Sequence, residues 1–163
     1  MTELQNKIVA LLKEDARTPQ DKIAVMLGED KKTVTEEISR LEKSGVIVKY
    51  TALVNSEAAN PHRVEALIEV RVSPVRAKGF DSIAEEIYQF PEVKSLYLMS
   101  GAYDLAVFIE GNSLREVASF VSEKLSVMDK VLSTATHFIL KKYKTEGVVL
   151  KGGEAGKRLS IQP

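Results

Sequence analysis

The order of apolar spacings constrains the fold of this 163-residue chain more than any other feature. Up to Gly45, apolar side chains recur every three or four positions, which is typical of amphipathic α-helices. Beyond it, short runs rich in β-branched and aromatic residues alternate with two further helical patterns, and such runs are typical of β-strands. The sequence therefore predicts a first domain of helices that ends in one strand and a second domain that mixes helices with a sheet.

Three helices are predicted for the first domain. The first covers residues 3–14. Thr18 is expected to cap the second helix and Gly28 to end it. Asp30 is expected to cap the third helix, which runs to about residue 43 and ends before Gly45. The apolar face of this third helix consists of Val34, Ile38 and Leu41.

Residues 46–55, VIVKYTALVN, are predicted to form a strand after the third helix. Three helices with a tight turn before the third, followed by a strand, form the layout of a winged helix-turn-helix, which binds DNA. This domain is expected to cover residues 1–55. Residues 56–63 are polar, include a proline, and are interpreted as a linker.

The second domain, residues 64–143, has a β-α-β-β-α-β order. Strands are predicted at 64–72, 93–99, 103–110 and 131–143, and helices at 79–90 and 113–128. This order predicts a ferredoxin-like α+β sandwich, in which two helices cover one face of a four-stranded antiparallel sheet. The strands are apolar at most positions, so the open face is expected to be apolar and to pair the chain into dimers or larger oligomers. Residues 144–163 form an extension, interpreted as a hairpin of 148–151 with 158–161, with a disordered basic tail as the alternative.

The composition excludes several classes of protein. The chain has no cysteine, which excludes disulfides, thiolate catalysis and thiolate zinc sites. No apolar run reaches the ~20 residues that a membrane-spanning helix needs. The N-terminus has acids and amides where a signal peptide would have a basic start. We therefore expect a cytoplasmic protein without membrane contact.

No sequence motif indicates an enzyme. Phosphate-binding loops, nucleophile elbows and dinucleotide fingerprints are all missing from the sequence. The two histidines, His62 and His137, are 75 positions apart and are interpreted as ordinary surface or strand residues. No catalytic activity, cofactor or metal is expected.

The third helix carries the side chains that would contact DNA. The positions on or beside the face opposite its core, together with Lys49 in the strand beyond, are Lys31, Lys32, Thr33, Thr35, Glu36, Ser39, Arg40, Lys43 and Lys49. Lys and Arg can bind phosphates or guanine edges, and Ser and Thr can bind either phosphates or bases. Residues 1–55 have equal numbers of acidic and basic side chains, nine each, so DNA contact has to come from this local patch.

The adjacent Glu36 and Glu37 oppose binding to a polyanion. Glu36 precedes Arg40 by four positions, so the two are expected to pair on the helix surface. A glutamate can also accept a hydrogen bond from cytosine in the major groove. The acidic pair therefore weakens non-specific attraction without excluding DNA binding, although a packed helical subdomain with a solvated charged face is the alternative.

Three stretches resemble the Lrp/AsnC family of bacterial and archaeal transcription regulators. TVTEEISRLEKSGVIVKYTALVN (33–55) is similar to that family's recognition helix and the strand that follows it. SLYLMSGAYDLAVFIEG (95–111) is similar to its G-x-Y-D hairpin, and STATHFILKKYK (133–144) to its last strand. The stretches occur in the family's order and spacing and span nearly the whole chain. The departure is Glu37, where relatives often have a basic residue.

The resemblance implies an effector site. In this family an amino acid or related metabolite binds between paired sheet domains, lined by the hairpin of Gly101, Tyr103 and Asp104. A glycine lets a ligand approach the backbone, Asp104 could bind an ammonium group, and hydroxyls could add contacts. The residues expected there are Ser100, Gly101, Tyr103, Asp104, Thr134 and Thr136. The alternative is that Gly101 only shapes the turn and Asp104 only caps the loop.

These observations predict a sequence-specific, DNA-binding transcriptional regulator, modulated by an amino acid or related metabolite at the subunit interface. Its expected partners are double-stranded DNA, that effector and further copies of the chain. One alternative is an oligomeric metabolite sensor that acts on a partner protein without contacting DNA. The other is an enzyme with a ferredoxin-like domain, for which no catalytic pair is evident.

Overall fold

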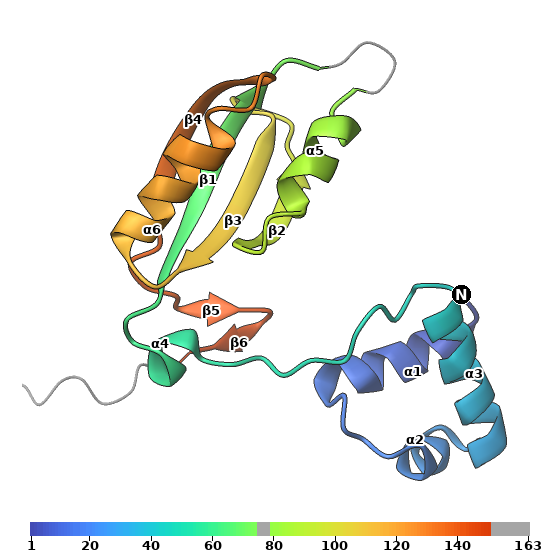
Figure 1. Cartoon of the computed structure of the whole chain (residues 1–163). Coiled ribbons are helices and arrows are strands. Elements are labelled where there is room, and N and C mark those ends of the chain that lie inside the picture. Colours follow the sequence, from blue (N-terminus) through green and yellow to red (C-terminus); the bar gives the residue numbers. More distant parts are fainter. Residues whose placement is uncertain (75–78, 151–163) are drawn as a thin grey trace, which may run out of the picture. The chain divides into compact units, whose positions relative to one another are not determined.

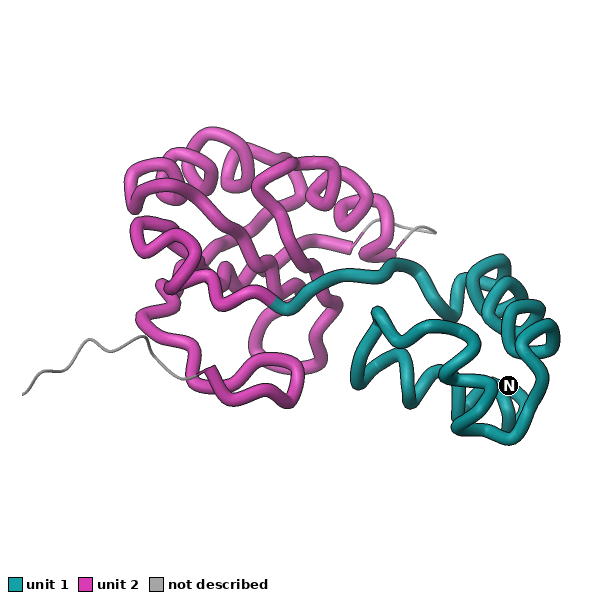
Figure 2. The backbone as a smooth tube through the Cα atoms, turned by 90° about the horizontal axis from the view of Figure 1, so that it is seen from below, with its two compact units in different colours: residues 1–53 teal, residues 54–163 magenta. Residues whose placement is uncertain are grey.

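The computed structural model describes residues 1–74 and 79–150 and divides the chain into two compact units. The first unit is Met1–Leu53 and the second is Val54–Pro163, coloured separately in Figure 2. Within the described part, no helix is long and apolar enough to cross a membrane.

The first unit is a three-helix bundle of α1 (Glu3–Glu14), α2 (Gln20–Leu27) and α3 (Lys31–Lys43) (Figure 1). The turn between α2 and α3 uses Gly28, whose φ of 70° lies in the left-handed region that glycine adopts without strain. One apolar side chain of α1, two of α2 and three of α3 form the core: Ile8, Ile23, Ala24, Val34, Ile38 and Leu41. The predicted helices and the core-facing side of α3 are therefore confirmed.

Two local predictions in the first unit are wrong. Pro19, and not Thr18, is the residue before α2, and no side chain caps that helix. The ring of Pro19 fixes φ at −63°, a value that extended and helical residues share, so proline can stand just outside the helix as well as inside it. Residues 46–55 form no strand, because no neighbouring segment in the described chain offers them a ladder of backbone partners.

The second unit has the predicted β-α-β-β-α-β order. Its strands are β1 (Val64–Val72), β2 (Val93–Leu98), β3 (Leu105–Gly111) and β4 (Val131–Phe138), joined antiparallel in the order β2-β3-β1-β4. Helix α5 (Asp81–Tyr88) and helix α6 (Leu114–Ser119) lie on the same face of the sheet (Figure 1). The ferredoxin-like sandwich is confirmed.

Alternation along β1 separates the two faces of the sheet. Every second residue of this strand, from Ala66 to Val72, is buried against the helices with Ile83 and Ile87 of α5. The open face instead carries Glu65, Leu67, Glu69 and Arg71. The expectation of an apolar open face is therefore wrong in part, because acids and a base interrupt apolar groups such as the edge-to-face pair Tyr97 and Phe108.

Three elements of the second unit differ from their predicted extents. The helix predicted at 113–128 is α6 followed by a π-helical segment, η1 (Phe120–Leu125). β4 ends at Phe138 instead of residue 143. A short helix, α4 (Ser56–Ala59), lies inside the predicted linker. Residue periodicity does not distinguish α from π turns, and it does not reveal where a partner strand ends.

The described part of the extension forms a hairpin at a different place from the predicted one. β5 (Lys144–Thr145) pairs with β6 (Val148–Val149) through a two-residue turn. Both turn residues, Glu146 and Gly147, have positive φ, as a type I′ turn requires. Residues 148–149 thus pair with the chain before them, while the predicted partner at 158–161 lies outside the described residues.

Candidate DNA-binding helix and effector loop

Helix α3 begins at a fixed point because Asp30 caps it. The Asp30 carboxylate accepts hydrogen bonds from the backbone N–H of Thr33 at 2.9 Å and from its hydroxyl at 2.6 Å. These bonds, first that of the hydroxyl, hold the pKa of Asp30 below its ordinary value. Thr35 donates its hydroxyl to Gln20 at the start of α2 or to the backbone oxygen of Lys31. Both threonines predicted to contact DNA thus also take part in the fold.

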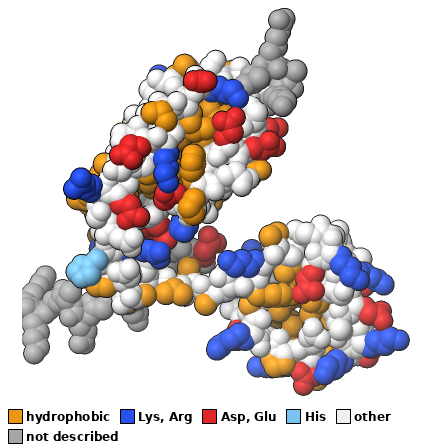
Figure 3. Space-filling view, viewed as in Figure 1, with side chains coloured by type: hydrophobic (Ala, Val, Ile, Leu, Met, Phe, Trp, Pro, Cys, Tyr) orange, Lys and Arg blue, Asp and Glu red, His pale blue; other side chains and the backbone are white. Residues whose placement is uncertain are grey.

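The predicted DNA-contacting residues lie along one side of α3 and just beyond it. Those exposed to solvent are Lys31, Lys32, Thr35, Glu36, Arg40, Lys43 and Lys49, whereas Thr33 and Ser39 are half-buried. Figure 3 shows Lys and Arg side chains at several places on the visible surface of this unit, with Asp and Glu among them. Two cations precede and two follow the exposed acid Glu36 along the helix.

The two glutamates have different surroundings. Glu37 is only 12% exposed and accepts hydrogen bonds from Gln5 of α1 at 2.8 Å and from Arg40 at 2.5 Å. The predicted pair of Glu36 with Arg40 is therefore wrong, because Glu37 has a second partner on α1 that holds its carboxylate within reach of the guanidinium. The exposed acids of α3 are therefore Glu36 and Glu42, and Glu42 accepts a hydrogen bond from the Tyr50 hydroxyl at 3.0 Å.

The predicted effector loop, residues 99–104, is anchored to the end of β1. The Asp104 carboxylate accepts a hydrogen bond from the backbone N–H of Val72 at 2.9 Å. The Arg71 guanidinium donates to the backbone oxygen of Ala102 at 2.9 Å. Sequence reasoning missed Arg71, since a contact across 31 positions leaves no local signal. Asp104 thus caps the loop, the role that was the alternative to binding an effector. Its carboxylate already accepts one hydrogen bond.

Gly101 is not required by the turn itself. Its φ is not among the positive values of the chain, and an added Cβ would meet no atom within 4 Å. Ser100 and Gly101 are exposed, and Tyr103 is half-buried. The chain around Gly101 would thus accept a side chain without strain, so any need for glycine has to come from something that approaches this loop.

The two predicted threonines lie on β4, which pairs with the same strand that anchors the loop. Thr134 is opposite Val70 and Thr136 is opposite Ile68, so both side chains point to the helix-covered face. The hydroxyl of Thr134 lies 3.4 Å from that of Ser126. The structure therefore brings Thr134 and the loop to the same end of the sheet, on either side of β1.

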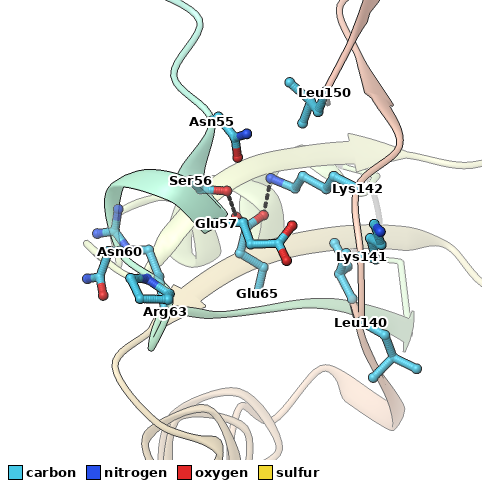
Figure 4. Close-up of a pocket in the computed structure, with 12 residues that line it drawn as sticks. Asn55, Ser56, Glu57, Asn60, Arg63, Glu65, Leu140, Lys141, Lys142 and Leu150 are labelled. Atoms are coloured by element: carbon cyan, nitrogen blue, oxygen red, sulfur yellow. Dashed lines mark hydrogen bonds and ion pairs between the residues drawn. The ribbon is translucent and has the colours of Figure 1, made fainter. Parts of the chain in front are cut away.

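A cavity of about 150 Å³ lies elsewhere in the second unit, and no predicted effector residue lines it. It is formed by α4, the start of β1 and the residues after β4 (Figure 4). Among the residues that the structure describes, no three His, Asp or Glu side chains gather in a way that could hold a metal ion.

Comparison with known proteins finds a matching family model for each of the two units. A family model for a winged helix-turn-helix DNA-binding domain matches residues 1–48, and one for the Lrp/AsnC ligand binding domain matches residues 65–149. The HTH-type transcriptional regulator YugG of Bacillus subtilis is 48% identical over 164 residues, covering 100% of this chain and 99% of that protein. FL11, an HTH-type regulator of Pyrococcus furiosus, is 31% identical and covers 88% and 92%.

Two crystal structures share the fold. The leucine response regulatory protein LrpA of Mycobacterium tuberculosis has a TM-score of 0.77 at 21% identity, covering 90% of this chain and 97% of that one. The transcriptional regulator NMB0573 of Neisseria meningitidis, in complex with L-methionine, has a TM-score of 0.74 at 21% identity, covering 93% and 96%.

A helix-turn-helix joined to a ligand-binding sandwich defines the chain as a DNA-binding transcriptional regulator. More narrowly, the chain belongs to the Lrp/AsnC family, because the ligand-binding model matches more than half of it and the Bacillus relative matches all of it. The resemblance found in the sequence is thereby confirmed.

Proposed function

We propose that this regulator binds DNA as a homodimer or larger homo-oligomer through α3, and that an amino acid bound at the sheet domains modulates this binding. The observation that carries the proposal is the capped helix α3, whose exposed side chains include four cations and two acids, Glu36 and Glu42. A dimer would present two such helices to half-sites about one helical turn apart. An effector changes that presentation only if it binds one arrangement more tightly than another.

DNA binding is tested by fluorescence anisotropy with a labelled duplex from upstream of the protein's own gene. Tight binding that survives an unrelated competitor duplex and weakens steeply with salt is expected, because Lys and Arg contacts release counterions from phosphates. A folded, oligomeric protein that binds no duplex at low salt would favour the alternative, a metabolite sensor that acts on a partner protein.

An amino-acid effector is proposed because the similar Neisseria protein was crystallised with L-methionine, as was a feast or famine regulatory protein of Mycobacterium tuberculosis. The loop 99–104 offers exposed backbone at Gly101 with no side chain of the chain in the way. We propose the effector site there, with Ser100, Tyr103 and Asp104 beside it and with Thr134 and Thr136 on β4, across β1 from the loop.

Replacing Gly101 by alanine is expected to leave the thermal unfolding temperature unchanged, because the added methyl meets nothing within 4 Å. Effector affinity is expected to fall about tenfold, which is 1.4 kcal/mol, since the methyl would occupy space that a ligand against the backbone needs. Isothermal titration calorimetry with a panel of amino acids, starting from L-methionine, measures this. Unchanged affinity for an amino acid that binds the wild type would place the effector away from this loop.

A further inference from the structure

The junction where the linker enters the sheet domain is held by one carboxylate, that of Glu65. This residue is the second of β1. One of its oxygens accepts a hydrogen bond from the Ser56 hydroxyl at 2.9 Å, and the other pairs with the Lys142 ammonium (Figure 4). Its backbone oxygen accepts from the N–H of Ile139 at 2.9 Å. Glu65 therefore joins α4, β1 and the segment that follows β4.

Glu65 faces a second carboxylate across the sheet. In the β1–β3 register it lies directly opposite Glu110, so the two acids share one face. Like charges in such positions repel. Arg63 pairs with Glu110 at 3.3 Å, and Lys142 pairs with Glu65, so each acid has its own cation from a different segment. Since the Glu65 side chain is only 14% exposed, losing Lys142 would leave its charge poorly solvated beside Glu110.

Helix α4 has little else to hold it in place. It has four residues, and none of them is buried. Its cap is a single bond from the backbone N–H of Ala58 to the side chain of Asn55 at 3.3 Å. One turn of helix is not stable by itself in water, because the first hydrogen bonds do not offset the entropy of fixing the backbone. Its position therefore depends on a tertiary contact, and Ser56 supplies one to Glu65.

We infer that Glu65 is a positioning residue that fixes α4 to the sheet domain and so restricts the directions in which the chain toward the DNA-binding unit leaves it. The effect of this restriction on DNA binding rests on the proposed function. In a dimer, restricting these directions raises the effective concentration of the second helix-turn-helix at its half-site once the first is bound. A loosened junction lowers that concentration without changing any residue on α3.

The first test is hydrogen exchange at the backbone amides of Ala59 and Asn60, which close the α4 turn. Ser56→Ala and Glu65→Gln each remove part of the anchor, and both are expected to speed exchange about fivefold or more. The matched control is Glu69→Gln, an acid on the same face of the same strand that pairs with His137 at 3.4 Å. Exchange at the wild-type rate in both anchor variants would overturn the inference.

The second test compares a duplex with two half-sites and a duplex with one. Glu65→Gln is expected to weaken binding to the two-half-site duplex about tenfold and to leave one-half-site binding unchanged, because only the former depends on linker direction. Equal loss on both duplexes, or no loss on either, contradicts a positioning role. If the wild type binds neither duplex, the proposed function fails, and the exchange experiment still decides whether Glu65 anchors α4.

Discussion

Replacing Arg40 by alanine is expected to lower the affinity for a specific duplex by roughly 10- to 100-fold, since one lost arginine contact costs about 1–3 kcal/mol. The Arg40 side chain is exposed on α3, and its guanidinium donates a hydrogen bond to the Glu37 carboxylate. The variant keeps the core side of the helix, so the oligomer and the fold are expected to remain. Fluorescence anisotropy at several salt concentrations measures the affinity and its salt slope.

The matched control is Arg17→Ala. Arg17 has the same charge and lies in the same unit, but its side chain is 93% exposed between α1 and α2, paired with Asp15. Its loss is expected to change specific binding little. If the Arg40 and Arg17 variants bind the duplex equally well, α3 does not read DNA through Arg40. That result would favour the alternative, a metabolite sensor that acts on a partner protein.

Replacing Leu41 by alanine is expected to lower the unfolding temperature of the first unit and to leave that of the second unit unchanged. Leu41 is 1% exposed within a core of six buried residues, and such a truncation costs about 2–5 kcal/mol. A unit of 53 residues has a stability of roughly 3–8 kcal/mol in total. Weaker DNA binding near the lowered unfolding temperature, with effector binding retained, is the expected result, measured by calorimetric unfolding and titration on the same protein.

Val25→Ala controls for the Leu41 variant. Val25 lies on α2 of the same unit and is 82% exposed, so removing its methyls creates no cavity. Its unfolding profile should match that of the wild type. A single transition that shifts as a whole in the Leu41 variant would mean that the two units unfold together, which contradicts separate cores.

The elements that sequence reasoning placed well are those whose signals are local. Asp30 and Thr33 are three positions apart, so the cap of α3 can be read from neighbours in the chain. Alternate residues of β1 face the same helices, so strand and face follow from period two. Such signals also sufficed for the order of elements in the second unit and hence for its sandwich.

The elements that failed depend on partners distant in sequence. Residues 46–55 include side chains that suit a strand, but no strand in the described chain forms backbone hydrogen bonds with them. β4 stops at Phe138, the residue at which its pairing with β1 ends, opposite Ala66. Strand propensity describes a side chain that suits a pleated surface, and only a neighbouring strand makes that surface.

By itself, the sequence determined the helix-turn-helix, the sandwich and the family, because spacing, caps and motifs all lie within a few residues of one another. Only the tertiary structure decided which partners the polar side chains have. Glu37 rather than Glu36 holds Arg40, since Gln5 lies 32 positions away on another helix. Asp104 reaches the N–H of Val72, and Glu65 reaches Ser56 and Lys142. Hydrogen bonds and ion pairs act over a few ångströms in space, and folding alone brings these groups that close.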